Sequence, residues 1–177
     1  HTKHTNAGSI LTIRWAQSED NFRAHSTRIN IGDEVDAIGW EPSRGGSDKV
    51  ELLQTRGQGY WNSKLILGST PKYRAQDGGR IDAWFQRSDQ RLYYVPCPHC
   101  GEKQPLEFGG KETAHGLKWP EGDPRLAYYV CQHNGCVVEE RHKRWMIENG
   151  EWHATAEGEP GIAGFHISAL YSLHPKA

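Results

Sequence analysis

Apolar and polar residues alternate along residues 1–92 in two different spacings, which predicts alternating strands and helices, the pattern of an α/β layer. Short runs of β-branched and other apolar residues indicate strands, whereas apolar residues three or four positions apart indicate helices. Strands are expected at residues 9–15, at 63–71, and at 27–38, where the strand runs into acidic residues. Helices are expected at residues 18–25, 47–56 and 79–88.

Two of these helices carry specific expectations. The second is expected to open with Ser47 and has apolar positions at helical spacing. The third places Ile81, Trp84 and Phe85 on one face. Half of such a layer would expose an edge strand and apolar faces, so residues 1–88 in isolation are expected to be poorly soluble.

The second half of the chain has a different pattern, because short aromatic and β-branched runs flank pairs of cysteines. RLYYV leads into the first pair, QPLEF leaves it and RLAYYV enters the second, and each run is expected to form a strand. Residues 138–150 are expected to form a helix with a salt-bridged surface, with Trp145 and Met146 turned inward. The seven tryptophans are expected to anchor the packing.

The composition narrows the class of protein. Only 36% of the residues are hydrophobic and the mean hydropathy is -0.79, so we expect a modest core. No apolar run approaches about 18 residues, which excludes a membrane-spanning helix. With 21 basic and 22 acidic residues and no long basic stripe, any contact with DNA has to be local or made by other parts. The chain opens with His1, shows no secretory leader, and is expected to be a fragment of a longer protein.

The four cysteines form two close pairs in the pattern C-x2-C-x30-C-x4-C. Cys97 and Cys100 lie in VPCPHCGEKQ, and Cys131 and Cys136 lie in YYVCQHNGC. Two turns that each offer two thiolates on one side supply the tetrahedral sulfur set that Zn²⁺ prefers. Together with the flanking strands, this pattern predicts a zinc ribbon over residues 89–138.

Two other interpretations of the cysteines stay open: a pair of disulfides, or four unrelated thiols. Pairs this close in sequence, in a chain without a secretory signal, favour a metal over disulfides. The second pair has a wider spacing than the usual two residues, so His99 or His133 could substitute as a ligand. A site with four cysteine ligands leaves no position for water or substrate, so the zinc is expected to be structural.

Two predicted strands end in residues that suit nucleotide chemistry. Asp33 and Glu34 end the strand of INIGDEVDAI, at the edge where open parallel sheets place their ligand crevice. An Asp here can hold Mg²⁺, and the following Glu can polarise the attacking water. Ser69 and Thr70 end the strand of LILGSTP, where they could sense the γ-phosphate. Acidic pairs after a strand are also common in solvated turns, and the chain contains no G-x-x-x-x-G-K-[ST] phosphate loop.

The order of these features resembles the large terminase subunit of lambda-like tailed bacteriophages, an ATP-driven DNA-packaging motor with an attached nuclease. The matching segments extend from about residue 10 to the C-terminus: INIGDEVDAI, LQTRGQGYWNSKLILGSTP, SDQRLYYVPCPHCGEKQPLEF, YYVCQHNGC, MIENGEWHA and GFHISALYS. The run from SDQRLYYVPCPHCGE through GFHISALYS is specific. The DEVD and STP segments gain their meaning from their place before it.

The resemblance implies roles for individual residues. Asp33 would be the Walker B magnesium ligand and Glu34 the catalytic carboxylate. Ser69 and Thr70 would belong to the motif that couples hydrolysis to DNA movement. Residues 1–88 would be the later half of a P-loop-type ATPase sheet whose phosphate loop lies upstream.

The resemblance also implies the architecture of the rest of the chain. A zinc ribbon with the four cysteines as ligands would follow the partial ATPase sheet. A helix and a β-rich linker at residues 139–177 would then lead toward a nuclease domain. The chain departs from the family at Asn30 and Gly32, which interrupt the apolar strand, and in its wider second cysteine pair.

For the full-length protein, the resemblance implies that ATP and Mg²⁺ are used to move duplex DNA into procapsids and that concatemers are cut by an endonuclease. The partners would be duplex DNA, the small terminase subunit, the portal protein and further copies in a motor ring, with no membrane involved. The protein would act in the host bacterial cytoplasm, transiently at the procapsid portal. The fragment itself is predicted to lack ATPase activity because it has no phosphate loop.

An alternative is a non-catalytic zinc-ribbon module that binds nucleic acid or protein, including the case of a prophage remnant. The four cysteines are compatible with both functions. The two polar strand ends discriminate between them, since a pure binding module has no need of DEVD and STP at neighbouring strand ends.

Overall fold

The computed structural model describes residues 1–4, 8–23, 25–42, 46–110, 112–121 and 123–173. The chain divides into two compact units, His1–Trp84 (unit 1) and Phe85–Ala177 (unit 2). The division falls within helix α3 (Arg80–Arg87). Both units contain strands and helices, so the prediction of a mixed α/β chain is confirmed. None of the helices in the described ranges is long and apolar enough to cross a bilayer.

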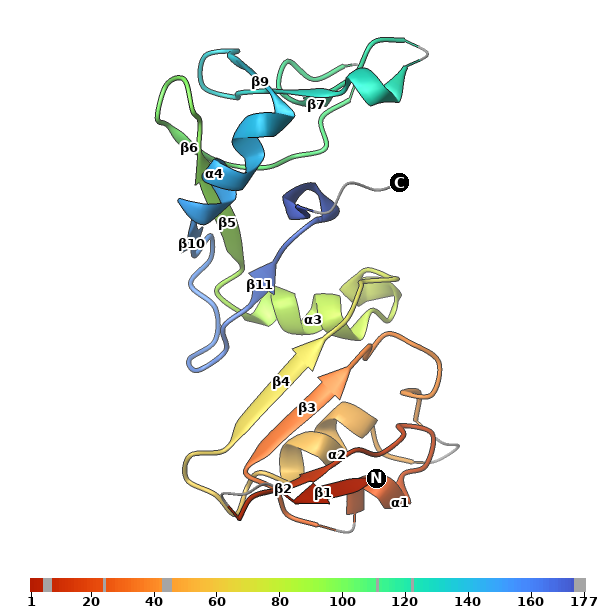
Figure 1. The fold of residues 1–177 in the computed structure, drawn as a ribbon. Coiled ribbons are helices and arrows are strands. Elements are labelled where there is room, and N and C mark those ends of the chain that lie inside the picture. The colour runs from red at the N-terminus through yellow and green to blue at the C-terminus, as the bar shows by residue number, and fades with distance from the viewer. Residues whose placement is uncertain (5–7, 24, 43–45, 111, 122, 174–177) are drawn as a thin grey trace. The chain divides into compact units, whose positions relative to one another are not determined.

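Unit 1 is built around two parallel strands, β3 (Ile29–Asp33) and β4 (Lys64–Gly68) (Figure 1). They pair along their whole length, with Asp33 opposite Gly68, so both strands end at the same edge. The connection between them contains α2 (Lys49–Thr55). A parallel pair needs such a crossover because its second strand must start again from the opposite end.

The remaining elements of unit 1 are short. β1 (Thr2–His4) and β2 (Ile10–Thr12) form a separate antiparallel hairpin. α1 (Asp20–Arg23) is a single turn, and the 3₁₀ turn η1 (Ala75–Asp77) precedes α3. The strand predicted at 9–15 therefore forms only in part, and it pairs with β1 instead of joining the parallel sheet.

One face of the β3–β4 sheet packs on the core of unit 1, and the other face is exposed. The buried apolar residues of this core come from α1, from the segment after β3 and from α2: Phe22, Val35, Trp40 and Val50. The opposite face presents the exposed side chains of Ile29, Ile31 and Ile66. The expectation that this layer exposes an apolar face is confirmed, while its effect on solubility stays a prediction.

The two residues that interrupt the apolar pattern of β3 both face the core. Asn30 is 6% exposed, and its side chain accepts a hydrogen bond from Thr27 Oγ1 (2.5 Å) and donates one to the carbonyl of Thr27 (3.1 Å). A Cβ on Gly32 would lie 3.0 Å from both Leu67 Cδ2 and Trp40 Cη2, so only glycine fits without a shift. These departures from an apolar strand are thus compatible with tight packing.

Two helices of unit 1 differ in detail from their predictions. The N-cap of α2 is Asp48, not Ser47, because the Asp48 carboxylate accepts from the backbone N–H groups at the helix start. In α3, Ile81 and Trp84 pack against the core of unit 1. Phe85 belongs to unit 2, where its ring lies 6.0 Å from the ring of His166.

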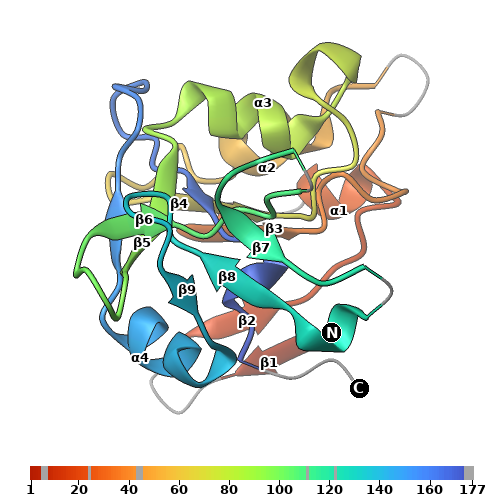
Figure 2. The ribbon, with the colours of Figure 1, turned by 90° about the horizontal axis from the view of Figure 1, so that it is seen from above.

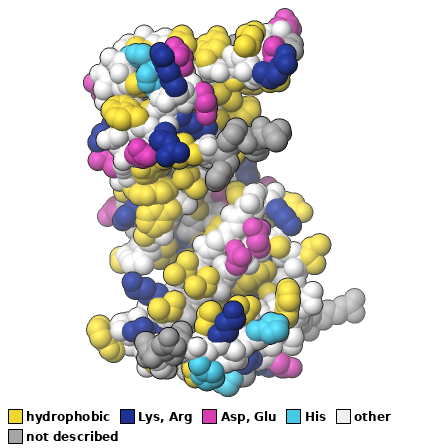
Figure 3. All heavy atoms as spheres, in the orientation of Figure 1, with side chains coloured by type: hydrophobic (Ala, Val, Ile, Leu, Met, Phe, Trp, Pro, Cys, Tyr) yellow, Lys and Arg dark blue, Asp and Glu magenta, His cyan; other side chains and the backbone are white. Residues whose placement is uncertain are grey.

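The central strand of unit 2 is β5 (Arg91–Pro96). It pairs antiparallel with β6 (Lys103–Pro105) and β10 (Glu151–His153), and parallel with β11 (Phe165–His166). Hydrophobic side chains gather on the surface over β10 and β11 (Figure 3). The ring of Trp152 there lies 5.0 Å from the rings of both Tyr93 and Phe165.

A second sheet of unit 2 contains three short antiparallel strands, β7 (Gly116–Lys118), β8 (Tyr128–Val130) and β9 (Val137–Val138). They lie side by side in Figure 2, and the short turn η2 (Pro124–Leu126) precedes β8. The predicted strand that leads into the first cysteine pair is therefore confirmed as β5, and the other two predicted runs form strands only in part, as β6 and β8.

The predicted helix at residues 138–150 is shorter than expected, since the chain at its predicted start belongs to β9. A 3₁₀ turn, η3 (Glu140–His142), leads into α4 (Lys143–Glu148). Met146 is buried as predicted, but the inward orientation of Trp145 is wrong, because Trp145 is 48% exposed. Neighbouring residues of a helix point about 100° apart, and here only Met146 belongs to the core of unit 2. The salt-bridged surface is confirmed by the pairs Arg141–Glu139, Lys143–Glu140 and Arg144–Glu148.

The C-terminal part of unit 2 is tied to β5 by a buried tyrosine in the turn η4 (Ala169–Tyr171). The Tyr171 hydroxyl donates to the carbonyl of Tyr93 (2.6 Å) and accepts from the N–H of Leu106 (2.7 Å). The expectation that all tryptophans anchor the packing is wrong: Trp40 is 7% exposed, whereas Trp61 is 97% exposed.

Candidate functional site

The two predicted site segments of unit 1 lie next to each other because β3 and β4 are parallel. Asp33, the last residue of β3, pairs with Gly68, the last residue of β4. Glu34 follows the first strand directly, and Ser69 and Thr70 follow the second. We call Asp33, Glu34, Ser69 and Thr70 the acidic edge. Residues more than 30 positions apart in the sequence thus share one end of the sheet.

Hydrogen bonds join the two turns of the acidic edge. The N–H of Val35 donates to the carbonyl of Gly68 (3.3 Å), and the N–H of Asp36 donates to Ser69 Oγ (3.1 Å). Glu34 has a φ of 51°, in the left-handed region that non-glycine residues rarely adopt. This backbone conformation ends the extended strand at Asp33.

Further hydrogen bonds hold the segment that follows Asp33 and Glu34. The indole Nε1 of Trp40 donates to the carbonyl of Asp33 (3.1 Å), and Nζ of the buried Lys49 donates to the carbonyl of Gly39 (2.7 Å). The carboxylate of Glu41 accepts the N–H of Gly39 (2.7 Å). Hydrogen bonds from its own backbone N–H and from that of Gly39 lower the pKa of Glu41. Several hydrogen bonds therefore fix the conformation of the turn after β3.

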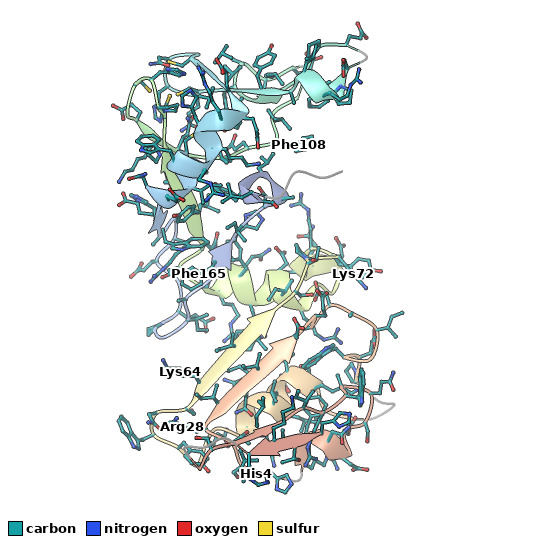
Figure 4. The ribbon with its side chains drawn as sticks, in the orientation of Figure 1. His4, Arg28, Lys64, Lys72, Phe108 and Phe165 are labelled. Carbon is teal, nitrogen blue, oxygen red and sulfur yellow. The ribbon has the colours of Figure 1, made fainter. Side chains whose placement is uncertain are left out.

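Asp36 is a member of this region that the sequence did not single out. It is 8% exposed, and its carboxylate accepts three backbone N–H groups: those of Arg80 (2.8 Å), Ile81 (3.1 Å) and Lys72 (3.3 Å). Figure 4 shows Lys72 near the end of β4. The only sign of Asp36 in the sequence is its place as the third acid of DEVD.

The acidic edge fits a magnesium ion. The side chains of Asp33 and Glu34 are exposed, and neither forms a salt bridge within the described part of the chain. A Cβ on Gly68 would lie 4.0 Å from Asp33 Oδ1, so glycine leaves the space beside this carboxylate open. Mg²⁺ is usually held by one or two carboxylates together with waters and substrate phosphates.

The second candidate site is the cysteine cluster of unit 2, which we define as Cys97, Cys100, Cys131 and Cys136. The sulfurs of Cys97, Cys100 and Cys136 lie within 4.8 Å of one another. Cys131 Sγ lies 3.8 Å from Cys100 Sγ but outside that group of three. All four thiols are free, so the disulfide interpretation does not describe this structure. Neither His99 nor His133 belongs to the group of three.

The first cysteine turn runs from Cys97 to Glu102. The N–H of Cys97 donates to the carbonyl of Glu102 (2.9 Å), and the N–H of Gly101 donates to the carbonyl of Cys97 (2.9 Å). Gly101 has a φ of 79°, a value that favours glycine. Cys100 occupies the third position after Cys97.

The second turn repeats the same hydrogen bonds with its second cysteine displaced. The N–H of Cys131 donates to the carbonyl of Cys136 (2.9 Å), and the N–H of Gly135, with a φ of 71°, donates to the carbonyl of Cys131 (3.0 Å). Asn134 occupies the position that Cys100 has in the first turn, and its Oδ1 accepts from Cys136 Sγ (2.6 Å). The wider spacing is therefore the same turn, with the sulfur two residues later.

The donor set of the cysteine cluster fits zinc. Two sulfurs bound to one tetrahedral Zn²⁺ are about 3.8 Å apart, given Zn–S bonds of about 2.3 Å. The Cys100–Cys131 separation has this value, 3.8 Å. Burial acts to raise the pKa of Cys131, but backbone N–H groups of the turn lower it on balance. A lowered pKa favours the thiolate, the form that binds metal. The backbone N–H of Glu102 acts to lower the pKa of Cys100, whereas burial and the neighbouring thiols raise it on balance.

A buried glutamine connects the two cysteine turns. Gln104 follows the first turn and is fully buried, and its Oε1 accepts the N–H of Gln132 in the second turn (2.8 Å). Its Nε2 has no hydrogen-bond partner among the residues that the structure describes. An amide N–H that is buried without a partner costs free energy. The Gln104 side chain therefore has a hydrogen-bond donor available in the buried region between the two turns.

Comparison with known proteins supports the resemblance inferred from the sequence. A family model described as "Phage terminase large subunit gpA, ATPase domain" matches residues 1–152. The chain is 34% identical over 172 residues to "Terminase, large subunit" of Enterobacteria phage P21, and 34% identical over 169 residues to "Terminase, large subunit" of Escherichia phage lambda. Each match covers 86% of this chain and 26% of the relative, so the chain spans about a quarter of their length. No solved structure matches. The chain therefore belongs to the gpA family of phage terminase large subunits, within the part that corresponds to the ATPase domain.

Proposed function

We propose that this chain is part of the ATPase of a DNA-packaging terminase and that the acidic edge carries out the hydrolysis of ATP. The observation that supports this most strongly is the parallel register of β3 and β4, which brings two polar strand ends to one edge. Ligands of open α/β sheets bind at this kind of edge. A binding module without catalysis does not need two polar strand ends at one edge of a sheet, so this arrangement favours an ATPase.

Each residue of the acidic edge has a proposed role. Asp33 would hold Mg²⁺ as the Walker B carboxylate, and Glu34 would orient and polarise the attacking water. Bound Mg²⁺ supplies positive charge to the phosphate oxygens of the nucleotide. Ser69 and Thr70 would form the coupling motif, since the bond from Asp36 N–H to Ser69 Oγ ties their turn to that of Glu34.

The cysteine cluster has a separate, structural role in this proposal. Cys97, Cys100, Cys131 and Cys136 would hold Zn²⁺, which crosslinks the two turns and stabilises a unit with a small core. In this scheme residues 1–88 belong to the ATPase domain, residues 89–138 form a zinc ribbon, and residues 139–177 lead toward a nuclease domain. The pairing of β10 and β11 with β5 is compatible with a link of this kind.

The proposed activity of the whole protein is ATP-driven translocation of duplex DNA into procapsids, with endonucleolytic cutting of concatemers. Its partners would be duplex DNA, the small terminase subunit, the portal protein and other copies of itself in a motor ring. It would act in the host bacterial cytoplasm and transiently at the portal. The phosphate loop and the nuclease carboxylates would come from other parts of the polypeptide.

Steady-state ATP hydrolysis by the full-length protein tests the proposal. Glu34→Gln is expected to lower kcat by about 100-fold or more, the usual contribution of a positioned general base. Asp77→Asn is the matched control, because Asp77 is exposed and its side chain has no partner among the described residues. Hydrolysis by Glu34→Gln at the rate of the control would contradict the proposal. The 177-residue chain alone is expected to be inactive.

A further inference from the structure

Helix α3 begins on a carboxylate supplied from far away in the sequence. The first N–H groups of a helix lack partners within the helix and need an acceptor. In α3, Asp36 Oδ1 accepts the N–H groups of both Arg80 (2.8 Å) and Ile81 (3.1 Å), although 44 positions separate Asp36 from Arg80. Local side chains usually make such caps. A distant cap instead fixes the start of α3 to the segment that follows β3.

The environment of this carboxylate shows that its position is specified. Asp36 is 8% exposed and forms no salt bridge with any described Lys, Arg or His. Its acceptors are satisfied by backbone, since Oδ2 also receives the N–H of Lys72 (3.3 Å). A buried charge without a counter-ion is costly unless several donors compensate it. Three converging N–H groups therefore hold the side chain in one place.

The backbone of Asp36 makes the connection to the acidic edge. Its N–H donates to Ser69 Oγ (3.1 Å), and the preceding residue, Val35, donates to the carbonyl of Gly68 (3.3 Å). Asp36 also lies two residues after Glu34. Asp36, which lies in the turn after β3, thus contacts both the turn after β4 and the start of α3.

We propose that Asp36 is a positioning residue for ATP hydrolysis, which fixes the Glu34 turn against the Ser69 turn and ties both to α3. This inference rests on the proposed function of the acidic edge. Because the chain passes from unit 1 to unit 2 within α3, a shift of either turn is carried to the helix that links the two units. Asp36 itself does not contact nucleotide in this account.

A further contact extends the same network to α2. Arg80 Nε donates to Asp48 Oδ2 (3.3 Å), while Asp48 Oδ1 accepts the N–H of Val50 (2.9 Å) at the start of that helix. The starts of α2 and α3 are therefore joined through one ion pair. The position of α3 relative to the sheet of unit 1 is specified by both Asp36 and Asp48.

The test uses the full-length protein and the variants Asp36→Asn, Ser69→Ala, their combination, Glu34→Gln and the control Asp77→Asn. Asn keeps one carbonyl oxygen for the start of α3 and replaces the other acceptor, which faces the Lys72 N–H, with a donor. We expect kcat for ATP to fall by about 10- to 100-fold, the scale of a misplaced reacting group. KM for ATP is expected to stay within about twofold, because the nucleotide contacts are unchanged.

The combination of variants separates positioning from general damage. If Asp36 acts through the Ser69 turn, Asp36→Asn with Ser69→Ala loses no more activity than the worse single variant. Ser69→Ala alone supplies a second readout if Asp36→Asn melts below the assay temperature. It removes the acceptor of the Asp36 N–H and leaves the carboxylate in place, and its kcat is also expected to fall at unchanged KM.

Each other outcome overturns the proposal. An Asp36→Asn rate equal to that of Asp77→Asn shows that the position of Asp36 does not matter. Multiplicative losses in the combined variant show that the two residues act independently. A parallel rise in KM shows damage to nucleotide binding instead. If Glu34→Gln retains full activity, the proposed function fails together with this inference. If Glu34→Gln is inactive while Asp36→Asn is normal, only this inference fails.

Discussion

The acidic edge and the cysteine cluster are assembled in opposite ways. The acidic edge joins Asp33 and Ser69, which lie at the ends of different strands, through parallel pairing and the hydrogen bond of Asp36. Each turn of the cysteine cluster is local, closed by hydrogen bonds between residues at most five positions apart. The first site therefore depends on the tertiary fold of unit 1, whereas each half of the second is complete within one short segment.

The two sites also differ in burial. We therefore expect variants at one site to change activity and variants at the other to change stability. Asp33 and Glu34 are exposed at a strand end, so changing them is expected to leave the core intact. Cys97 and Cys131 are each 1% exposed and belong to the core of unit 2, so changing them removes part of that core. Variants at the two sites should accordingly give opposite patterns of activity and stability.

The largest effect is expected at the cysteine cluster. Cys97→Ser in the 177-residue chain should release zinc and unfold unit 2, because structural zinc contributes on the order of 10 kcal/mol of apparent binding energy in small modules. Metal content and circular dichroism measure the two effects, starting from about one Zn²⁺ per chain. His99→Ala is the control and should retain the metal. Equal zinc loss from both variants would contradict the cysteine assignment.

Trp40 tests whether the acidic edge depends on packing behind it. Trp40→Ala removes a 7% exposed ring and the hydrogen bond to the Asp33 carbonyl, and should cost about 3–5 kcal/mol in the free energy of unfolding. Trp61→Ala, at a 97% exposed position, should change it by less than about 0.5 kcal/mol. Denaturant unfolding of the 177-residue chain measures both. Similar values for the two variants would contradict the packing described for unit 1.

A smaller effect is expected at Gly32. Gly32→Ala would place a Cβ 3.0 Å from Leu67 Cδ2 and 3.1 Å from Val35 Cγ1, which should destabilise unit 1 by about 1–3 kcal/mol. Gly59→Ala is the matched control, since a Cβ there meets nothing within 4 Å. The same unfolding experiment compares them. A neutral Gly32→Ala would show that the strand packs more loosely than described.

The smallest effect concerns the geometry of the second cysteine turn. The double variant Asn134→Cys with Cys136→Ala moves the sulfur to the position that Cys100 has in the first turn. Because both turns have the same backbone hydrogen bonds, zinc affinity should stay within about tenfold of the original. This change in affinity would be smaller than the change expected when a residue that supports a metal ligand is removed. Competition with a chromogenic chelator measures it. An affinity as low as that of Cys136→Ala alone would show that the turns are not equivalent.

Local features of both sites were predictable from the sequence because their signals are local. The cysteine spacing, the strands around it and the ends of β3 and β4 all follow from short patterns. The parallel register that places Asp33 opposite Gly68 agrees with the α/β pattern as well. The wider spacing of the second pair does not indicate a repeated turn, since only hydrogen bonds such as that of Gly135 reveal it.

Long-range features could not be predicted in this way. Asp36 gains its role from the N–H groups of α3, and no spacing within DEVD indicates a partner 44 residues away. Trp40 and Trp61 are the same residue type in similar polar surroundings, yet one is buried and the other exposed. Gly32 interrupts the apolar pattern of the strand, but its lack of a side chain leaves room for the ring of Trp40.

The most direct test of the central claim is a single-turnover experiment with the full-length Glu34→Gln protein, in which bound ATP and released phosphate are measured in the same sample. We expect ATP to bind as tightly as in the unaltered protein and to remain uncleaved during many turnovers of the latter. Cleavage of the bound ATP at the unaltered rate would contradict the claim that the acidic edge carries out hydrolysis.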